Sequence, residues 1–189
     1  MPYVPANVPE EIGSAFLAEE HQRIANAYNL QEAFGALIID IAGTPTPTSQ
    51  LITTTPAKVE NWNVRGPSEQ LSDGPILVNP RLTPDFDLQA FEPGIYLLSF
   101  YVSYSHTLGD SLIWQIFLNG IDTRIGTRVD ASQQTDVSST SATTIFTIAE
   151  ESIIDLRVSV PAGDMDATIT VDTGALGIFK LRDLRTRFS

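Results

Sequence analysis

The stretch Ile95-Tyr-Leu-Leu-Ser-Phe-Tyr-Val-Ser-Tyr104 decides the fold of this chain. It is rich in aromatic and β-branched residues and follows the turn signal Pro93-Gly94, which is typical of a β-strand. Successive side chains of a strand point to opposite faces, so every second residue shares a face. The residues that we expect on the core face are Tyr96, Leu98, Phe100, Val102 and Tyr104.

Further strand patterns follow towards the C-terminus. The run Ser111 to Leu118 ends at Asn119-Gly120, a dipeptide that favours positive φ at both central positions of a tight turn. Ile121 to Val129 is its expected return strand. Later strand-like runs are Ser141 to Ala149, Ile153 to Val160, Ala167 to Asp172 and Leu176 to Leu181. Short strands separated by turns predict a mainly β sandwich.

Two of these strands differ in how their faces are patterned. In the run from Ile153, alternation places Ile154, Leu156, Val158 and Val160 inward and Asp155, Arg157 and Ser159 outward. In the run from Ser111, apolar side chains occupy both faces. Such a strand is either central and covered twice or part of a subunit interface. Leu97 and Tyr101, on the outer face of the first strand, are either scattered surface apolar residues or part of such an interface.

The chain before Glu92 is less regular. Leu51 to Trp62 has a strand pattern broken at Pro56, and residues 66 to 84 carry four prolines, which indicates a long loop or an edge segment. Residues 43 to 50 form a Pro/Thr linker, where we place the main boundary. Ala33 to Ile41 is a short apolar run that periodicity does not assign, although its isoleucines favour a strand. Its apolar surface must be covered by something.

The N-terminus is expected to be an extended arm followed by a helix. Pro2 and Pro5 disfavour helix in residues 1 to 8, whereas Pro9 fits the first helical position. The helix would run to about Asn29. Its apolar stripe consists of Ile12, Phe16, Leu17, Ile24 and Tyr28. Glu20 interrupts this stripe, which disfavours a coiled coil. The stripe either packs on the chain's own domain or docks on another protein.

Composition excludes several classes of function. The chain has 23 acidic and 11 basic residues, with a net charge of −12, which argues against binding to the phosphates of a nucleic acid. The absence of cysteine excludes disulfides and thiolate zinc sites. No stretch approaches a membrane span, and residues 1 to 15 show no secretory signal. We expect a soluble protein, made in a cytoplasm, whose partner is a protein or a glycan.

Catalysis and metal binding are not expected. His21 and His106 are the two histidines, and no nucleophile-elbow pattern accompanies them; His106 is interpreted as a solvated loop residue. Asp164 and Asp166 offer oxygen ligands of the kind that calcium prefers, without the spacing of a dedicated calcium loop. We therefore predict no metal and no cofactor. The alternative from a different class of function is a depolymerising enzyme that uses carboxylates such as these two.

Basic residues gather at the C-terminus. They are Lys180, Arg182, Arg185 and Arg187. Because they are placed beyond the expected end of the last strand, they form either a solvated tail or a contact with an acidic neighbouring subunit.

The segment Glu92-Pro-Gly-Ile-Tyr-Leu-Leu-Ser-Phe-Tyr-Val-Ser-Tyr104 resembles the PGxYxFxFxVS segment of the C1q and tumour-necrosis-factor-like (TNF-like) jelly roll. The resemblance covers residues 51 to 181, with Leu51 to Val59 as the first strand. It implies a jelly-roll sandwich that forms a homotrimer through one sheet and serves binding, not catalysis. The trimer contacts that it implies are Leu97, Tyr101, Trp114 and Phe179.

A second resemblance concerns the N-terminus. Residues 2 to 12 and 16 to 25 are similar to the attachment segments of tailed-bacteriophage virion proteins. The sequence therefore predicts three parts: an attachment element (1–42), a linker (43–50) and a jelly roll with a basic tail (51–189). We expect a structural virion protein, a trimeric head-decoration or head-fibre protein that contacts other capsid or tail proteins. The alternative is a receptor-binding tail-fibre tip that recognises a host surface glycan.

Overall fold

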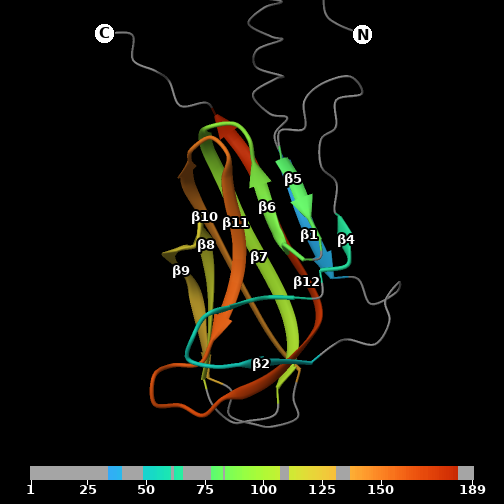
Figure 1. Cartoon of the computed structure of the whole chain (residues 1–189), viewed down its shortest axis with the longest axis vertical. Helices are drawn as coiled ribbons and strands as arrows, with labels where there is room; N and C mark the ends of the chain where they lie inside the picture. Colours follow the sequence, from blue (N-terminus) through green and yellow to red (C-terminus); the bar gives the residue numbers. More distant parts are fainter. Residues whose placement is uncertain are drawn as a thin grey trace, which may run out of the picture.

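The computed structural model describes residues 34–39, 49–60, 62–65, 78–82, 84–106, 111–130 and 137–182. These residues form two antiparallel sheets of six strands each, packed face to face as a sandwich (Figure 1). The predicted mainly β sandwich is confirmed. The strands are β1 (Phe34–Ile39), β2 (Ser49–Ile52), β3 (Ala57–Lys58), β4 (Val64–Arg65), β5 (Val78–Arg81), β6 (Asp87–Ala90), β7 (Gly94–His106), β8 (Ser111–Leu118), β9 (Ile121–Asp130), β10 (Ser138–Ile148), β11 (Ser152–Ser159) and β12 (Ala167–Arg182).

The first sheet, called sheet A, has the order β10-β7-β12-β1-β4, and β2 pairs with the start of β12. The second, sheet B, has the order β5-β6-β11-β8-β9, and β3 pairs with β11. The core lies between the sheets. The inward residues predicted for β7, from Tyr96 to Tyr104, are all buried, as are those of β11 from Ile154 to Val160. Alternation therefore placed both strands correctly.

The predicted hairpin at Asn119-Gly120 is confirmed. Both residues have positive φ, 51° and 77°, and β8 pairs with β9 on either side of the turn. The Asn119 side chain accepts a hydrogen bond from the Ile153 amide at 2.7 Å, and the Asn119 amide donates one to the Ile153 carbonyl at 2.8 Å. The turn is thus fixed to the beginning of β11.

Two strand predictions need correction. Residues 167 to 182 form one strand, β12, where two strands separated at Thr173-Gly174 were expected; the register shifts between Val171 and Thr173 without ending the strand. Leu51 to Trp62 is divided between the sheets: β2 belongs to sheet A and β3 to sheet B, with Pro56 between them. The predicted edge segment is confirmed in part, since β5, which contains Pro80, is the edge strand of sheet B.

The sandwich begins earlier than the sequence suggested. All six residues of β1 pair with β12, from Phe34 opposite Phe179 to Ile39 opposite Gly174. Leu37 and Ile39 are buried in the core. The surface of this apolar run is thus covered by its own domain, and it belongs to the jelly roll, not to the attachment element. The arm and helix predicted before it lie outside the described residues.

Both ends of the described chain lie at one end of the sandwich. β1 starts opposite the last residues of β12, so Phe34 and Arg182 lie close to the same end of sheet A. The connections β2–β3 and β11–β12 lie at the opposite end (Figure 1). Phe34, the first residue that the structure describes, therefore lies at the end opposite these two turns.

Candidate self-association surface

The outer face of sheet A, which points away from the core, carries an apolar row across three strands. Ile145 of β10, Leu97 of β7 and Phe179 of β12 are in register, and residues in register share a face. Ile145 is 60% exposed and Phe179 39% exposed. Large apolar side chains are thus presented to solvent side by side.

The next row on this face consists of small residues. Thr143, Ser99, Gly177 and Ala36 are in register across β10, β7, β12 and β1. They leave a hollow of about 180 Å³, which we call the sheet A hollow. It is lined by Gly35, Ala36, Leu97, Ser99, Gly177, Ile178 and Phe179.

A third row closes the other side of the hollow. Tyr101 lies opposite Ala175, which lies opposite Ile38, and Tyr101 is 44% exposed. The outer face of sheet A therefore has two rows with bulky apolar side chains and a depression between them. No aspartate, glutamate, lysine or arginine occurs in these three rows. Exposed, contiguous apolar surfaces of this kind are typical of protein interfaces and of ligand-binding grooves.

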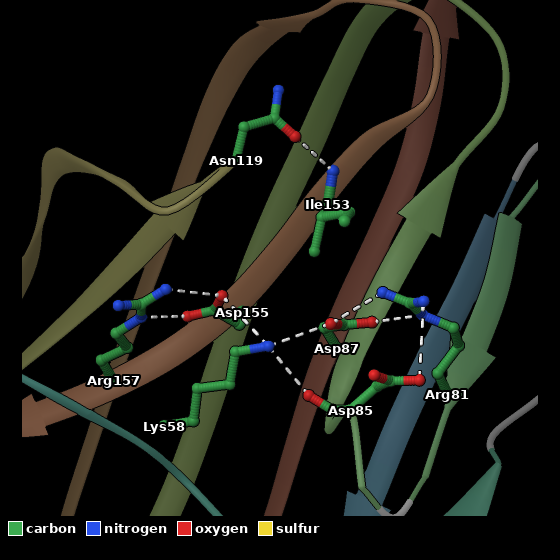
Figure 2. Close-up of polar contacts among 8 residues, drawn as sticks. All are labelled: Lys58, Arg81, Asp85, Asp87, Asn119, Ile153, Asp155 and Arg157. Carbon is green, nitrogen blue, oxygen red and sulfur yellow. Dashed lines mark hydrogen bonds and ion pairs between the residues drawn. The ribbon is translucent and has the colours of Figure 1, made fainter.

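The outer face of sheet B is different. Asp87 is buried there and is bound by two cations (Figure 2). Arg81 donates to both of its carboxylate oxygens, Nε at 2.7 Å and a terminal nitrogen at 2.9 Å, and Lys58 Nζ donates at 3.0 Å. The hydrogen bond from Arg81 to Asp87 raises the pKa of the guanidinium, against the opposing effect of its burial. The charge of Asp87 is thus satisfied within the chain.

Asp155, on the neighbouring strand β11, continues this network. It is 1% exposed, although the sequence placed it facing outward. Arg157 donates to both of its oxygens, at 2.6 and 3.1 Å, and Lys58 Nζ lies 3.6 Å from it (Figure 2). The Arg157 guanidinium also covers the Phe117 ring, 4.2 Å from the ring centroid. Asp155 does face outward, but the side chains of β3 and β11 shield it from water.

The structure brings together three of the four residues predicted for the trimer contact. Leu97, Tyr101 and Phe179 lie on the outer face of sheet A. Trp114 does not: its side chain has no exposed surface and packs against the Tyr104 ring, with the centroids 4.8 Å apart. A side chain enclosed in the core of one chain does not contact a second chain, so Trp114 is a core residue. The predicted attachment residues Ile12, Phe16, Leu17, Ile24 and Tyr28 lie outside the described residues.

Two further interpretations are corrected. His106 is the last residue of β7 and is buried, opposite Ile169 of β12, so it is not a solvated loop residue. Lys180 lies within β12, is buried, and donates to Glu92 at 2.6 Å. It therefore closes the end of the sandwich and does not belong to a tail. Arg185 and Arg187 lie outside the described residues.

Among the described residues, no three His, Asp or Glu side chains gather as a metal site would require. Asp164 lies in the turn after β11, where its amide donates to the Pro161 carbonyl at 3.1 Å. Within the same residues, no helix has the length and apolar character needed to cross a membrane.

A second hollow, which no sequence pattern predicted, lies between the β8–β9 hairpin and β10. It measures about 400 Å³ and is lined by Leu118, Asn119, Ile121, Asp122, Thr123, Arg124 and Phe146. The hairpin is irregular there, because the register shifts after Ile116 and Arg124 adopts a φ of 60°. Ile121 at its tip is 72% exposed. The sequence signal for this site is Ile121 itself, an apolar residue directly after the tight turn Asn119-Gly120.

Comparisons with known proteins agree with the architecture. No protein-family pattern and no curated protein sequence matches the chain. Among solved structures, the Eiger TNF from S. frugiperda matches with a TM-score of 0.57 at 12% identity, over 84% of this chain and 98% of that one. Murine APRIL matches with a TM-score of 0.49 at 14% identity, over 79% and 100%. The predicted TNF-like jelly-roll fold is confirmed, and at this identity the likeness concerns the fold.

Proposed function

We propose that this protein is a homotrimeric jelly-roll component of a tailed-bacteriophage particle, a head-decoration or head-fibre protein that acts by binding and not by catalysis. The observation that carries the proposal is the outer face of sheet A, where Leu97, Tyr101, Ile145 and Phe179 form an apolar surface that no described residue covers. A soluble protein rarely exposes such a surface unless a partner covers it. The jelly-roll fold favours another copy of the chain as that partner.

The threefold arrangement is supported by the resemblance of the chain to C1q and TNF-like domains. The light-scattering mass of the purified full-length protein tests it. We expect three times 20.6 kDa. A mass of 20.6 kDa at every protein concentration measured would contradict the proposal.

Attachment to the particle is assigned to the chain before Phe34. Two observations support this assignment: the similarity of residues 2 to 12 and 16 to 25 to phage attachment segments, and the exit of the chain at Phe34 from the end that also holds Arg182. The turns at the opposite end would then face away from the particle. The protein would be made in the host cytoplasm and reside in the virion.

Two deletions test the attachment. Removal of residues 1–33 should leave a folded jelly roll that no longer joins particles, whereas removal of residues 1–42 should also unfold it, because β1 supplies the buried Leu37 and Ile39. Circular dichroism reports folding, and the protein content of purified particles reports incorporation. Incorporation of the 1–33 deletion at the full level would refute the assignment.

A fibre tip that binds a host surface glycan is the second candidate. It is favoured by the turn Pro161–Asp166, which lies at the end opposite Phe34 and carries Met165 with 65% exposure. A glycan array probed with the full-length protein separates the candidates, because a decoration protein should bind no glycan.

A further inference from the structure

A closed ring of three copies requires two different surfaces on each copy. A surface that contacts its own equivalent produces a pair, whereas a ring needs a head-to-tail contact between unlike surfaces. If the proposed trimer holds, on which this inference rests, the outer face of sheet A supplies one of the two surfaces. The other must lie elsewhere on the chain.

The sheet A hollow has the size of one side chain. Its volume is about 180 Å³, and a cavity of about 150 Å³ lined by apolar residues holds a benzene-sized group. Small-molecule sites are larger, roughly 300 to 1,000 Å³. The hollow exists because Ala36, Ser99 and Gly177 are small while Leu97 and Phe179 beside them are large. Its shape therefore suits a single apolar side chain from outside the sheet.

Ile121 is a side chain of this kind. At 72% it has the greatest exposure among the large apolar side chains that the structure describes. The hairpin that carries it is held on both sides, by Asn119 bound to Ile153 and by Asp122, whose carboxylate accepts from the Arg124 amide at 2.7 Å and from the Gln115 amide group at 3.0 Å. Ile121 is thus an exposed side chain at the hydrogen-bonded tip of a hairpin of sheet B, and not part of the outer face of sheet A.

The strand register places this tip and the hollow at the same level along the sandwich. Ile121 and Phe146 line one hollow. Phe146 follows Ile145, which is in register with Leu97 and, through it, with Phe179 at the rim of the sheet A hollow. In a ring whose axis runs along the strands, contacting surfaces lie at equal height. The tip of the hairpin and the rim of the sheet A hollow meet this condition.

We propose that Ile121 of each copy inserts into the sheet A hollow of the next copy, between Ala36, Ser99 and Gly177, and thereby closes the ring. The bulky rows on either side of the hollow pack around the tip of the hairpin. Burial of an isoleucine that is exposed in the single chain drives the contact.

Two variants of the full chain test the contact from its two sides. Ile121→Lys replaces the inserted side chain by a charged one. Gly177→Leu fills the hollow: a Cβ at position 177 would meet no atom closer than 3.8 Å, so the chain should still fold. Each variant should reduce the light-scattering mass threefold, with an unchanged circular dichroism spectrum. Gly177→Leu is informative because it makes the face more apolar, so general stickiness would keep the trimer.

Leu51→Lys is the matched control. Leu51 is 63% exposed and lies on β2, beside the start of β12 and away from the hollow. This variant should keep the mass of the unchanged protein.

Mixing the two variants gives the decisive measurement. Ile121 of the Gly177→Leu chain should enter the intact hollow of the Ile121→Lys chain, so an equal mixture should show pairs of twice 20.6 kDa. If the unchanged protein is trimeric and Ile121→Lys stays trimeric, or if the mixture contains single chains alone, the insertion is refuted and the trimer stands. If the unchanged protein is a single chain, both proposals fall.

Discussion

The outer faces of the two sheets follow the same alternation of side chains but differ in the groups that they carry: paired charges on sheet B and exposed apolar side chains on sheet A. On sheet B, the outward carboxylates Asp87 and Asp155 are neutralised by Lys58, Arg81 and Arg157 of the same chain. On sheet A, Leu97, Tyr101 and Phe179 face outward without such cover. The difference teaches that the free face, and not the charged one, needs a partner, because sheet B has already satisfied its own groups.

The largest effect is expected on sheet B. Asp87→Ala would leave Arg81 and Lys58 without the carboxylate that joins them. Arg81 and Lys58 are partly exposed, at 26% and 33%, so what is lost is their hydrogen bonding to a charged group, which is worth about 1.5–3 kcal/mol; urea unfolding should show a loss of that order. Asp85→Ala is the control, because Asp85 is half-exposed and lies 3.5 Å from Arg81; about 0–1 kcal/mol is expected there. Equal losses in both variants would mean that burial does not distinguish the two carboxylates.

On sheet A, Phe179→Lys should act on association and not on folding. The side chain is partly exposed in the single chain, so the fold tolerates a lysine, but the contact loses an apolar group worth roughly 1.5–3 kcal/mol per copy. Light scattering should report single chains while circular dichroism remains unchanged. A trimer that survives this change would place the interface elsewhere.

Alkaline pH should lower the stability of the fold, through a tyrosine in the core between the two sheets. Burial raises the pKa of the Tyr104 phenol, because the charged form is poorly solvated there. The neutral form therefore contributes stability that is fully present below about pH 10, the ordinary pKa of tyrosine, and is lost as the pH rises through the folded value. The melting temperature should therefore decrease as the pH is raised above about 10. Tyr104→Phe should remove this part of the decline, and an unchanged decline would argue against Tyr104 as its source.

Salt should produce the smallest effect. An apolar interface on sheet A is not screened, so the mass should be the same in low salt and in about 1 M salt, where the Debye length is about 3 Å. Dissociation at high salt would indicate that ion pairs, absent from the three rows of sheet A, hold the copies together.

Local signals in the sequence predicted what local chemistry determines. Asn119-Gly120 fixes its turn by its own backbone preferences, and the strict alternation from Tyr96 to Tyr104 identifies the core face. Trp114 was misplaced because its strand is apolar on both sides, so alternation does not identify the inner one. Only the packing of the two sheets determines which face of β8 lies in the core.

Contacts between distant residues were beyond such signals. β1 pairs with β12 across roughly 140 residues of chain. The Pro/Thr-rich residues 43–50 suggested a domain boundary, but β1, which precedes them, belongs to the same sheet as the strands that follow. The network on sheet B joins Lys58, Arg81, Asp87 and Asp155 from four strands. None of these pairings leaves a periodic pattern, and so neither the sheet A hollow nor the charged network could be read in advance.

The pairing of β1 with β12 also sets how the protein bears a pull. A force between Phe34 and Arg182, which lie at one end, would peel these two strands apart one hydrogen bond at a time. A force between Phe34 and the far turns would instead load all six residue pairs of β1 and β12 in shear. A molecule anchored through its N-terminus and gripped at its far end is thus pulled in its mechanically strong direction.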